Sequence, residues 1–167
     1  MVTDLAGAII SGKPFCCRPT ELNEDELVLW ASEEPQDLFL ERLVHDRTFN
    51  KEALAKLLVT FRSQAAGHYR WPDFMKQLET AVNEHASQGK GKVVLLILDT
   101  FQDWSDLVDD DENKTGPIKR ELRSIRLFME ATGAAVLLIH HSRKAEGGFI
   151  SQMIRGASAL EIGRAHV

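Results

Sequence analysis

Two uninterrupted apolar stretches dominate the hydrophobic pattern of the chain, VVLLIL at residues 93–98 and AAVLLI at residues 134–139. Their length fits a β-strand better than a helix. Because neither stretch alternates with polar residues, both faces of each strand should be buried. Such strands are typical of a parallel sheet that is covered by helices on both sides.

The segment between these stretches has a helical pattern. Four apolar residues recur at intervals of three or four, the spacing of one helix face: Ile118, Leu122, Ile125 and Met129. This pattern predicts a helix over Pro117–Thr132, with Gly133 at its left-handed end. The acidic segment Asp103–Gly116 before it is predicted as a loop.

The first half of the chain alternates in the same way. The pattern predicts a helix over Val2–Ile10, a strand over Leu27–Ala31, a helix opened by Pro35 with Leu38 and Leu43 on one face, and a helix over Pro72–Ser87. Two interpretations remain open for Phe49–Gln64: one helix, or a helix through Lys56 followed by a strand over Leu57–Phe61. The alternation predicts an α/β fold, three layers with a mainly parallel sheet flanked by helices.

Composition narrows the class of protein. The chain has 167 residues, of which 44% are hydrophobic, enough for one globular domain. Its net charge of −5 leaves no overall basic field for nucleic acid. The only cysteines, Cys16 and Cys17, are neighbours and give no disulfide framework, which favours a reducing, cytoplasmic location. No apolar run approaches the roughly 20 residues that cross a membrane.

Polar residues follow three of the predicted strands: Ser32-Glu33-Glu34, Asp99-Thr100 and His140-His141-Ser142. Each group alone has a plain explanation as a helix cap, a turn former or a structural histidine. Because the carboxyl ends of parallel strands share one edge, however, the three groups are expected to lie together. Acids and imidazoles at one edge could hold a divalent cation and activate water.

Several segments carry a family resemblance: DLAGAIISGKPF (4–15), VLWASEEPQDLFLERL (28–43), VVLLILDTF (93–101), ATGAAVLLIHHSRK (131–144) and RGASAL (155–160). In this order they resemble the RecA-like core of P-loop ATPases of the AAA family, of the type found in hexameric replicative helicases of plasmids and phages. The KaiC and DnaB families are more distant relatives. The resemblance covers nearly the whole chain.

The resemblance implies ATP and Mg²⁺ as cofactors and a role for each strand-end residue. Asp99 would be the Walker B carboxylate, holding Mg²⁺ through water, with Thr100 beside it in the nucleotide site. Glu33 would be the base that acts on the attacking water, with Glu34 as its supporting neighbour. His141, together with His140, would be at the sensor position near the γ-phosphate.

The resemblance also implies partners. The segment Ala145–Ile154, flanked by Arg143, Lys144 and Arg155, would face the channel of a homo-oligomeric, hexameric ring and contact single-stranded DNA. A basic-edged surface loop is the alternative interpretation.

Two parts of the family pattern are absent. No G-x-x-x-x-G-K-[ST] phosphate loop occurs in the chain. The family's arginine finger would follow RGASAL, where IGRAHV at residues 162–167 instead resembles the translation of a sequencing adaptor. The expected organisation is therefore a partial RecA-like domain at residues 1–161 that is truncated at both ends, with a non-native tail at residues 162–167.

Three functional hypotheses follow. The leading one is a fragment of an ATP-driven DNA helicase or replication ATPase, inactive without its phosphate loop. The second is a regulatory RecA-like module that binds nucleotide without translocating. The third is a metal-dependent hydrolase that uses Asp99, Glu33 and the two histidines directly.

Overall fold

A four-stranded sheet forms the middle of the protein. The computed structural model of the chain describes residues 2–46, 49–62, 70–107 and 115–139. The strands lie in the order β2-β1-β3-β4, and each neighbouring pair is parallel. Their bounds are Glu26–Ser32 (β1), Leu57–Phe61 (β2), Lys92–Asp99 (β3) and Ala135–Leu138 (β4).

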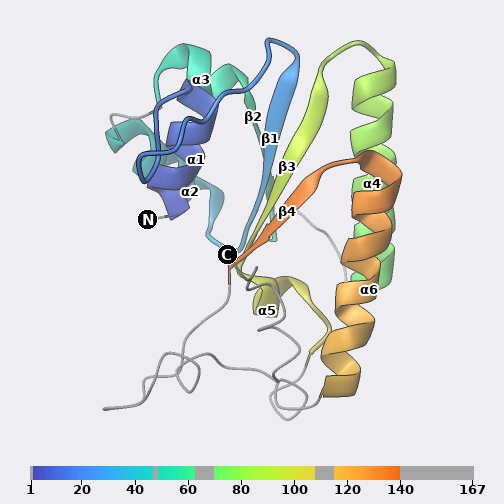
Figure 1. The fold of residues 1–167 in the computed structure, drawn as a ribbon. Helices are drawn as coiled ribbons and strands as arrows, with labels where there is room; N and C mark the ends of the chain where they lie inside the picture. Colours follow the sequence, from blue (N-terminus) through green and yellow to red (C-terminus); the bar gives the residue numbers. More distant parts are fainter. Residues whose placement is uncertain (1, 47–48, 63–69, 108–114, 140–167) are drawn as a thin grey trace, which may run out of the picture.

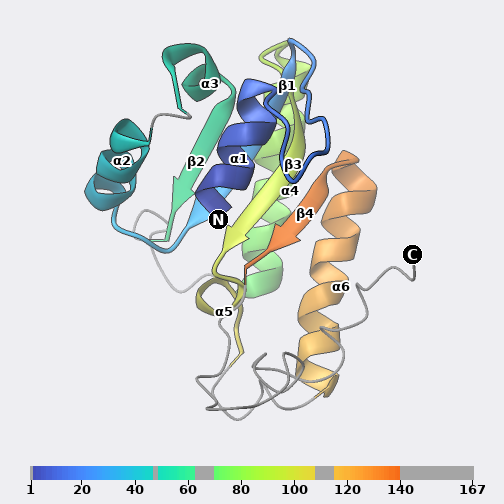
Figure 2. The ribbon, with the colours of Figure 1, turned by 60° about the vertical axis from the view of Figure 1, so that its left-hand side comes forward.

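Helices cover both faces of this sheet (Figures 1 and 2). One face is covered by α1 (Val2–Ser11), α2 (Gln36–His45) and α3 (Lys51–Ala55), and the other by α4 (Trp71–Ser87), α5 (Phe101–Trp104) and α6 (Thr115–Thr132). Each face has its own cluster of buried apolar side chains. The predicted α/β fold, with a parallel sheet between two layers of helices, is confirmed.

Strand β1 shows why the middle of each central strand is apolar. Val28 and Trp30 pack into the cluster under α1 and α2, whereas Leu29 and Ala31 pack into the cluster under α4 and α6. Because successive side chains point to opposite faces and both faces are covered, the polar residues of this strand are confined to its two ends, Glu26 and Ser32.

The predicted helices are present, but two of them turn a different side chain inward. In α2 the buried residues are Phe39 and Leu43, and Leu38 is 53% exposed. In α6 the inward position is occupied by Phe128, 1% exposed, and Met129 is 41% exposed. In both helices an aromatic ring next to the expected aliphatic side chain fills the core at that one position, while Leu43, Ile118 and Ile125 are buried as predicted.

The open interpretation of Phe49–Gln64 is resolved in favour of a short helix and a strand, α3 and β2. Asn50 begins α3, because its side-chain Oδ1 accepts the backbone N–H of Ala53 at 2.7 Å. Gly133 ends α6 with a φ of +72°, as predicted.

The prediction of a loop from Asp103 was wrong in its first residues, because α5 extends to Trp104. This helix has only four residues, too few to show a helical period. Its two apolar residues, Phe101 and Trp104, are both buried and hold it against the sheet. Helix α6 begins at Thr115, two residues before the predicted start.

None of the helices in the described parts of the chain is both long enough and apolar enough to span a membrane.

Trp71 connects the start of α4 by hydrogen bonds to the segment that follows α5 and to α6. The backbone N–H of Trp71 donates to Asp106 Oδ2 at 2.6 Å, and its indole Nε1–H donates to the backbone carbonyl of Glu121 at 3.1 Å. The carboxyl group of Glu121 is half-buried, and burial, followed by the negative charge of Asp106, raises its pKa to about 7 against the opposing effect of Arg120. The folded chain therefore favours a protonated Glu121 near neutral pH.

This raised pKa predicts that stability falls as the pH rises. The folded chain binds the Glu121 proton more tightly than the unfolded chain, whose pKa is near 4.5. The stabilisation is therefore fully present below about pH 4.5 and is lost as the pH rises through about 7. Glu121→Gln, which cannot ionise, should be more stable than the parent at pH 8 by about 1 kcal/mol, a value reduced for solvent screening.

Urea unfolding at a series of pH values between 5 and 8 measures this effect. The advantage of Glu121→Gln should shrink toward zero at the acid end of the series. Glu84→Gln, a change of an exposed residue on α4, is the matched control and should follow the parent at every pH. An unchanged pH slope in Glu121→Gln would contradict the prediction.

Candidate active site

The ends of β1 and β3 meet at the carboxyl edge of the sheet. Ser32 is paired with Asp99 in the sheet register, and the backbone N–H of Glu33 donates to the carbonyl of Asp99 at 2.7 Å. Both strands end on the side where α5 lies (Figures 1 and 2). Glu33 and Asp99 therefore lie on one edge, as their positions after parallel strands led us to expect.

The side chain of Glu33 contacts Thr100 rather than Asp99. Its Oε2 accepts the Thr100 hydroxyl at 2.9 Å and the Thr100 backbone N–H at 3.3 Å. The same hydroxyl also contacts Oδ2 of Asp103 in α5. Thr100 is 3% exposed, so its hydroxyl has these two carboxylates as partners in place of solvent.

The surroundings of Glu33 raise the pKa of its carboxyl group above the ordinary value. Burial is the main cause, and the hydrogen-bonded carboxyl group of Asp103 adds to it, whereas the bonds from Thr100 act in the opposite direction. A carboxylate with a raised pKa is a better acceptor of a proton from water. The site therefore contains a group with the properties of a general base.

Asp99 is fixed through both its side chain and its backbone. Its Oδ2 accepts the indole N–H of Trp30 at 3.3 Å, and its carbonyl accepts the indole N–H of Trp104 at 3.4 Å. The peptide bond between Asp99 and Thr100 is cis. Carboxylate and hydroxyl oxygens are the ligands that Mg²⁺ prefers, so Asp99 and Thr100 fit that cation.

Glu34 points to α2 and away from these groups. Its carboxylate lies 2.9 Å from the guanidinium of Arg42, close enough for an ion pair although the angles of a hydrogen bond are not met. Arg42 also lies over the rings of Trp30 and Phe39, at 5.6 and 5.2 Å from their centroids. Glu34 therefore has an ion pair with a structural role, and no such pair is found for Glu33 within the part of the chain that the structure describes.

The remaining predicted site residues lie outside the described residues: His140, His141, Arg143, Lys144 and Arg155. The chain reaches the same edge immediately before them. The backbone N–H of Ile139 donates to Leu98 at 2.9 Å, and the Ile139 carbonyl accepts the N–H of Phe101 at 2.7 Å. The end of β4 therefore lies next to the segment that carries Asp99 and Thr100.

The sequence pattern did not identify Asp103 as a residue of this site, because it predicted a loop that begins at Asp103. A signal for it was present. Thr100 is the N-cap of α5 and Asp103 follows three residues later, the spacing of a Ser/Thr-x-x-Glu/Asp capping pattern. That spacing places the two side chains at the same end of a short helix.

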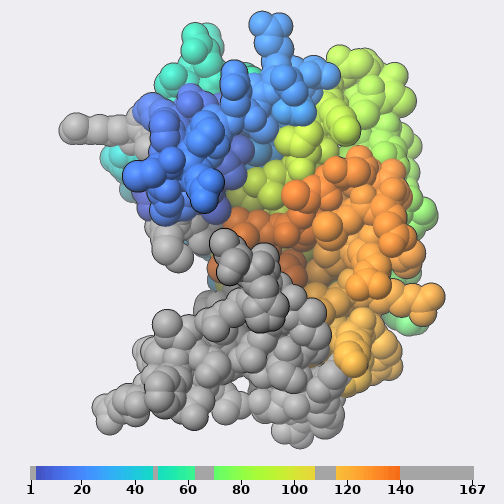
Figure 3. Space-filling view, viewed as in Figure 1, coloured from blue at the N-terminus to red at the C-terminus, as the bar shows by residue number. Residues whose placement is uncertain are grey.

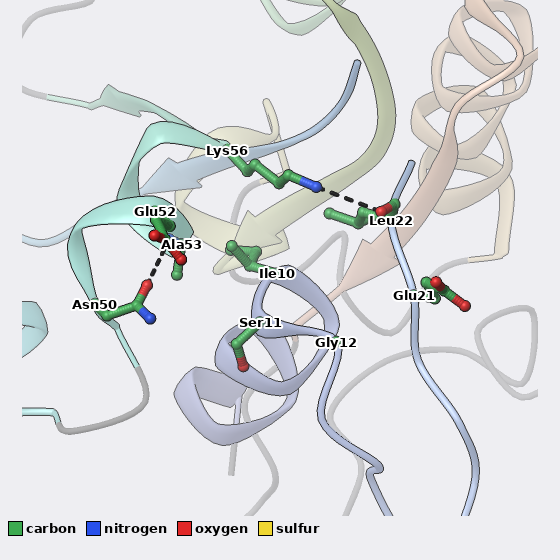
Figure 4. Close-up of a pocket in the computed structure, with 9 residues that line it drawn as sticks. All are labelled: Ile10, Ser11, Gly12, Glu21, Leu22, Asn50, Glu52, Ala53 and Lys56. Atoms are coloured by element: carbon green, nitrogen blue, oxygen red, sulfur yellow. Dashed lines mark hydrogen bonds between the residues drawn. The ribbon is translucent and has the colours of Figure 1, made fainter. Parts of the chain in front are cut away.

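A cavity of about 300 Å³ lies at the opposite end of the sheet, near the starts of β1 and β2 (Figure 4). It is lined by the end of α1, by residues 21 and 22, and by α3 and its flanks. Lys56 closes one side of it, donating to the carbonyls of Leu22 at 3.3 Å and Asn23 at 3.0 Å. No predicted site residue lines this cavity.

A directly coordinated metal ion needs several protein ligands close together. Among the described residues, no three or more His, Cys, Asp or Glu side chains form a group that could hold a metal ion. The third hypothesis, a hydrolase with a directly ligated metal, therefore gains no support from this part of the chain.

A parallel sheet between two helical layers, with acids and a threonine at its carboxyl edge, defines an α/β fold of the nucleotide-binding kind that is consistent with a RecA-like core. A family model described as "AAA domain" matches residues 1–147. The chain belongs to this family and contains an ATPase-like, nucleotide-binding module. A search of the curated proteins found no match to the chain.

Proposed function

We propose that the chain is the core of an ATP-hydrolysing, RecA-like motor that acts on single-stranded DNA as a helicase or replication ATPase of a plasmid or phage. Membership of the AAA family supports the use of ATP. The resemblance of the LLILDT, SEEPQD and LLIHHSRK segments to plasmid and phage helicases supports the more specific role and a hexameric ring.

One observation carries the proposal. Glu33, which follows β1, and the Asp99-Thr100 pair, which follows β3, are joined at the carboxyl edge by three hydrogen bonds. A proton acceptor and an oxygen ligand for a cation are thereby held on one edge by two buried strands.

In the proposed reaction, Asp99 would hold the Mg²⁺ that accompanies ATP. The cation, when bound, neutralises charge on the phosphates. Glu33 accepts a proton from the water whose oxygen attacks the γ-phosphorus, and the bond from that phosphorus to the β–γ bridging oxygen breaks, so that ADP leaves with this oxygen. His141 and His140 are proposed to sense the γ-phosphate.

The sequence of the chain contains no phosphate loop of the pattern G-x-x-x-x-G-K-[ST]. Backbone amides and a lysine in such a loop hold the β- and γ-phosphates in P-loop enzymes. We propose that sequence upstream of residue 1 in the natural reading frame provides this loop, and that the chain without it does not turn over ATP.

ATP hydrolysis by the present chain and by a chain extended upstream in its own reading frame tests the proposal. The extended chain should release phosphate in the presence of Mg²⁺, and Asp99→Ala should lower that rate by about a hundredfold or more. Glu41→Gln, an exposed change on α2, is the matched control and should leave it unaltered. An extended chain with a phosphate loop but no hydrolysis would overturn the proposal.

Adding single-stranded DNA to the same assay separates a motor from a regulatory module. A motor should hydrolyse ATP faster with DNA than without it, and the rate should become less dependent on DNA as the salt concentration rises. An ATPase that DNA does not affect would support the regulatory alternative.

A further inference from the structure

The Thr100 hydroxyl lies between two carboxylates that compete for it. It contacts Glu33 Oε2 at 2.9 Å and also Asp103 Oδ2. A threonine hydroxyl has a single hydrogen, so it can donate to one ionised carboxylate at a time. Whenever Asp103 accepts this hydrogen, Glu33 loses it.

The other contacts of Glu33 make this competition important. Apart from the hydroxyl, its Oε2 accepts the backbone N–H of Thr100 at 3.3 Å, just beyond the usual range for such a bond, and its carboxyl group is also hydrogen-bonded to that of Asp103. The backbone of Glu33 is fixed more firmly, through its 2.7 Å bond to the Asp99 carbonyl. The residue is therefore held in place by its main chain, while the freedom of its carboxylate depends on the Thr100 hydroxyl.

Asp103 is well placed to control that hydroxyl. Asp103 belongs to α5, whose first and last residues, Phe101 and Trp104, are both buried. The core therefore fixes the position of the Asp103 main chain. Thr100 is itself buried and has no solvent alternative. The direction of the hydroxyl is thus set by its two carboxylate neighbours.

We propose that Asp103 is a positioning residue that accepts the Thr100 hydroxyl and thereby frees the carboxylate of Glu33 to accept a hydrogen from water. The inference rests on the proposed function, because the use of Glu33 as a proton acceptor is part of that function. Asp103 itself contacts neither the water nor the phosphates in this proposal. It acts on Glu33 through the shared Thr100 hydroxyl and through its own contact with the Glu33 carboxyl group.

Removal of Asp103 should therefore slow turnover without weakening substrate binding. In Asp103→Ala the hydroxyl donates to Glu33 Oε2 alone, so this oxygen keeps one acceptor site fewer for water. We expect kcat for ATP in the extended chain to fall about tenfold and KM to change less than about twofold. Asp103→Asn keeps an acceptor oxygen at the same place and should recover most of the loss.

A double-mutant cycle with Thr100→Val separates this role from a merely structural one. Valine keeps the branched shape of threonine and lacks the hydroxyl, so the part of the Asp103→Ala effect that passes through this hydroxyl should be absent, and kcat should fall by a clearly smaller factor than in the Thr100 background. An equal effect of Asp103→Ala with and without the hydroxyl would overturn the proposal. Asp73→Ala, an exposed aspartate in the first turn of α4, is the matched control.

A second measurement uses the chain as it is and does not depend on hydrolysis. The chemical shifts of the Glu33 side-chain carboxyl carbon and the Thr100 amide should both change in Asp103→Ala and stay unchanged in Asp73→Ala. Unchanged shifts in Asp103→Ala would overturn the linkage. If the shifts change and the extended parent chain hydrolyses no ATP, the linkage stands and the proposed function fails.

Discussion

Replacement of Glu33 by glutamine (Glu33→Gln) should lower kcat for ATP hydrolysis in the extended chain by about a hundredfold to ten-thousandfold. Glutamine has the same shape and can still accept the bonds from the Thr100 hydroxyl and amide. It cannot accept a proton from water. The chemical step should therefore be lost while the local structure is kept.

Steady-state phosphate release at saturating ATP measures this effect. The KM for ATP should stay within about threefold of the parent value, because Glu33 acts on the attacking water and does not bind the phosphates in this proposal. Glu34→Gln is the instructive comparison. Since Glu34 is paired with Arg42 on α2, we expect a smaller loss from its replacement. A larger loss in Glu34→Gln than in Glu33→Gln would show that the two roles have been exchanged.

Truncation of Trp71 to alanine (Trp71→Ala) should destabilise the folded chain by about 4 kcal/mol. Trp71 is fully buried at the start of α4, packs edge-on against Phe101 with ring centroids 5.7 Å apart, and donates its indole N–H to the carbonyl of Glu121. The change leaves a cavity where α4, α5 and α6 meet. A loss of this size is a large part of the stability of a typical single domain.

Urea unfolding followed by far-ultraviolet circular dichroism measures this loss. Trp71→Phe serves as the matched control, because it retains most of the apolar volume and lacks only the larger ring and the N–H. It should cost about 1–2 kcal/mol. Equal losses in the two variants would show that the hydrogen bond, and not the packing, is what stabilises this junction.

The sequence was sufficient to predict the sheet because the buried strands consist of uninterrupted apolar residues, which are easy to recognise. Uninterrupted runs such as residues 93–98 are typical of strands covered on both faces, and helices cover both faces of β3, whereas β4 at the edge of the sheet is only partly buried. The helices were predicted less accurately at single positions. Whether Met129 or Phe128 enters the buried cluster depends on which side chain fits the space there, and a periodic pattern does not contain that information.

The site was predicted in part for a related reason. Position after a parallel strand brings Glu33 and Asp99 to one edge, and this follows from topology alone. The partners of each carboxylate depend on side-chain directions at the ends of β1 and β3. Those directions turn Glu33 toward Thr100 and Asp99 toward Trp30, and they bring in Asp103 from a helix too short to recognise by its period.

The two indole groups that donate to Asp99 have a practical consequence. Trp30 reaches the carboxylate of this residue and Trp104 reaches its carbonyl, and the chain has only one other tryptophan. Tryptophan fluorescence therefore reports on the neighbourhood of this aspartate through two of the three indole groups, and Trp71 contributes the rest of the signal. The protein carries its own optical reporter at the place where a cation would arrive.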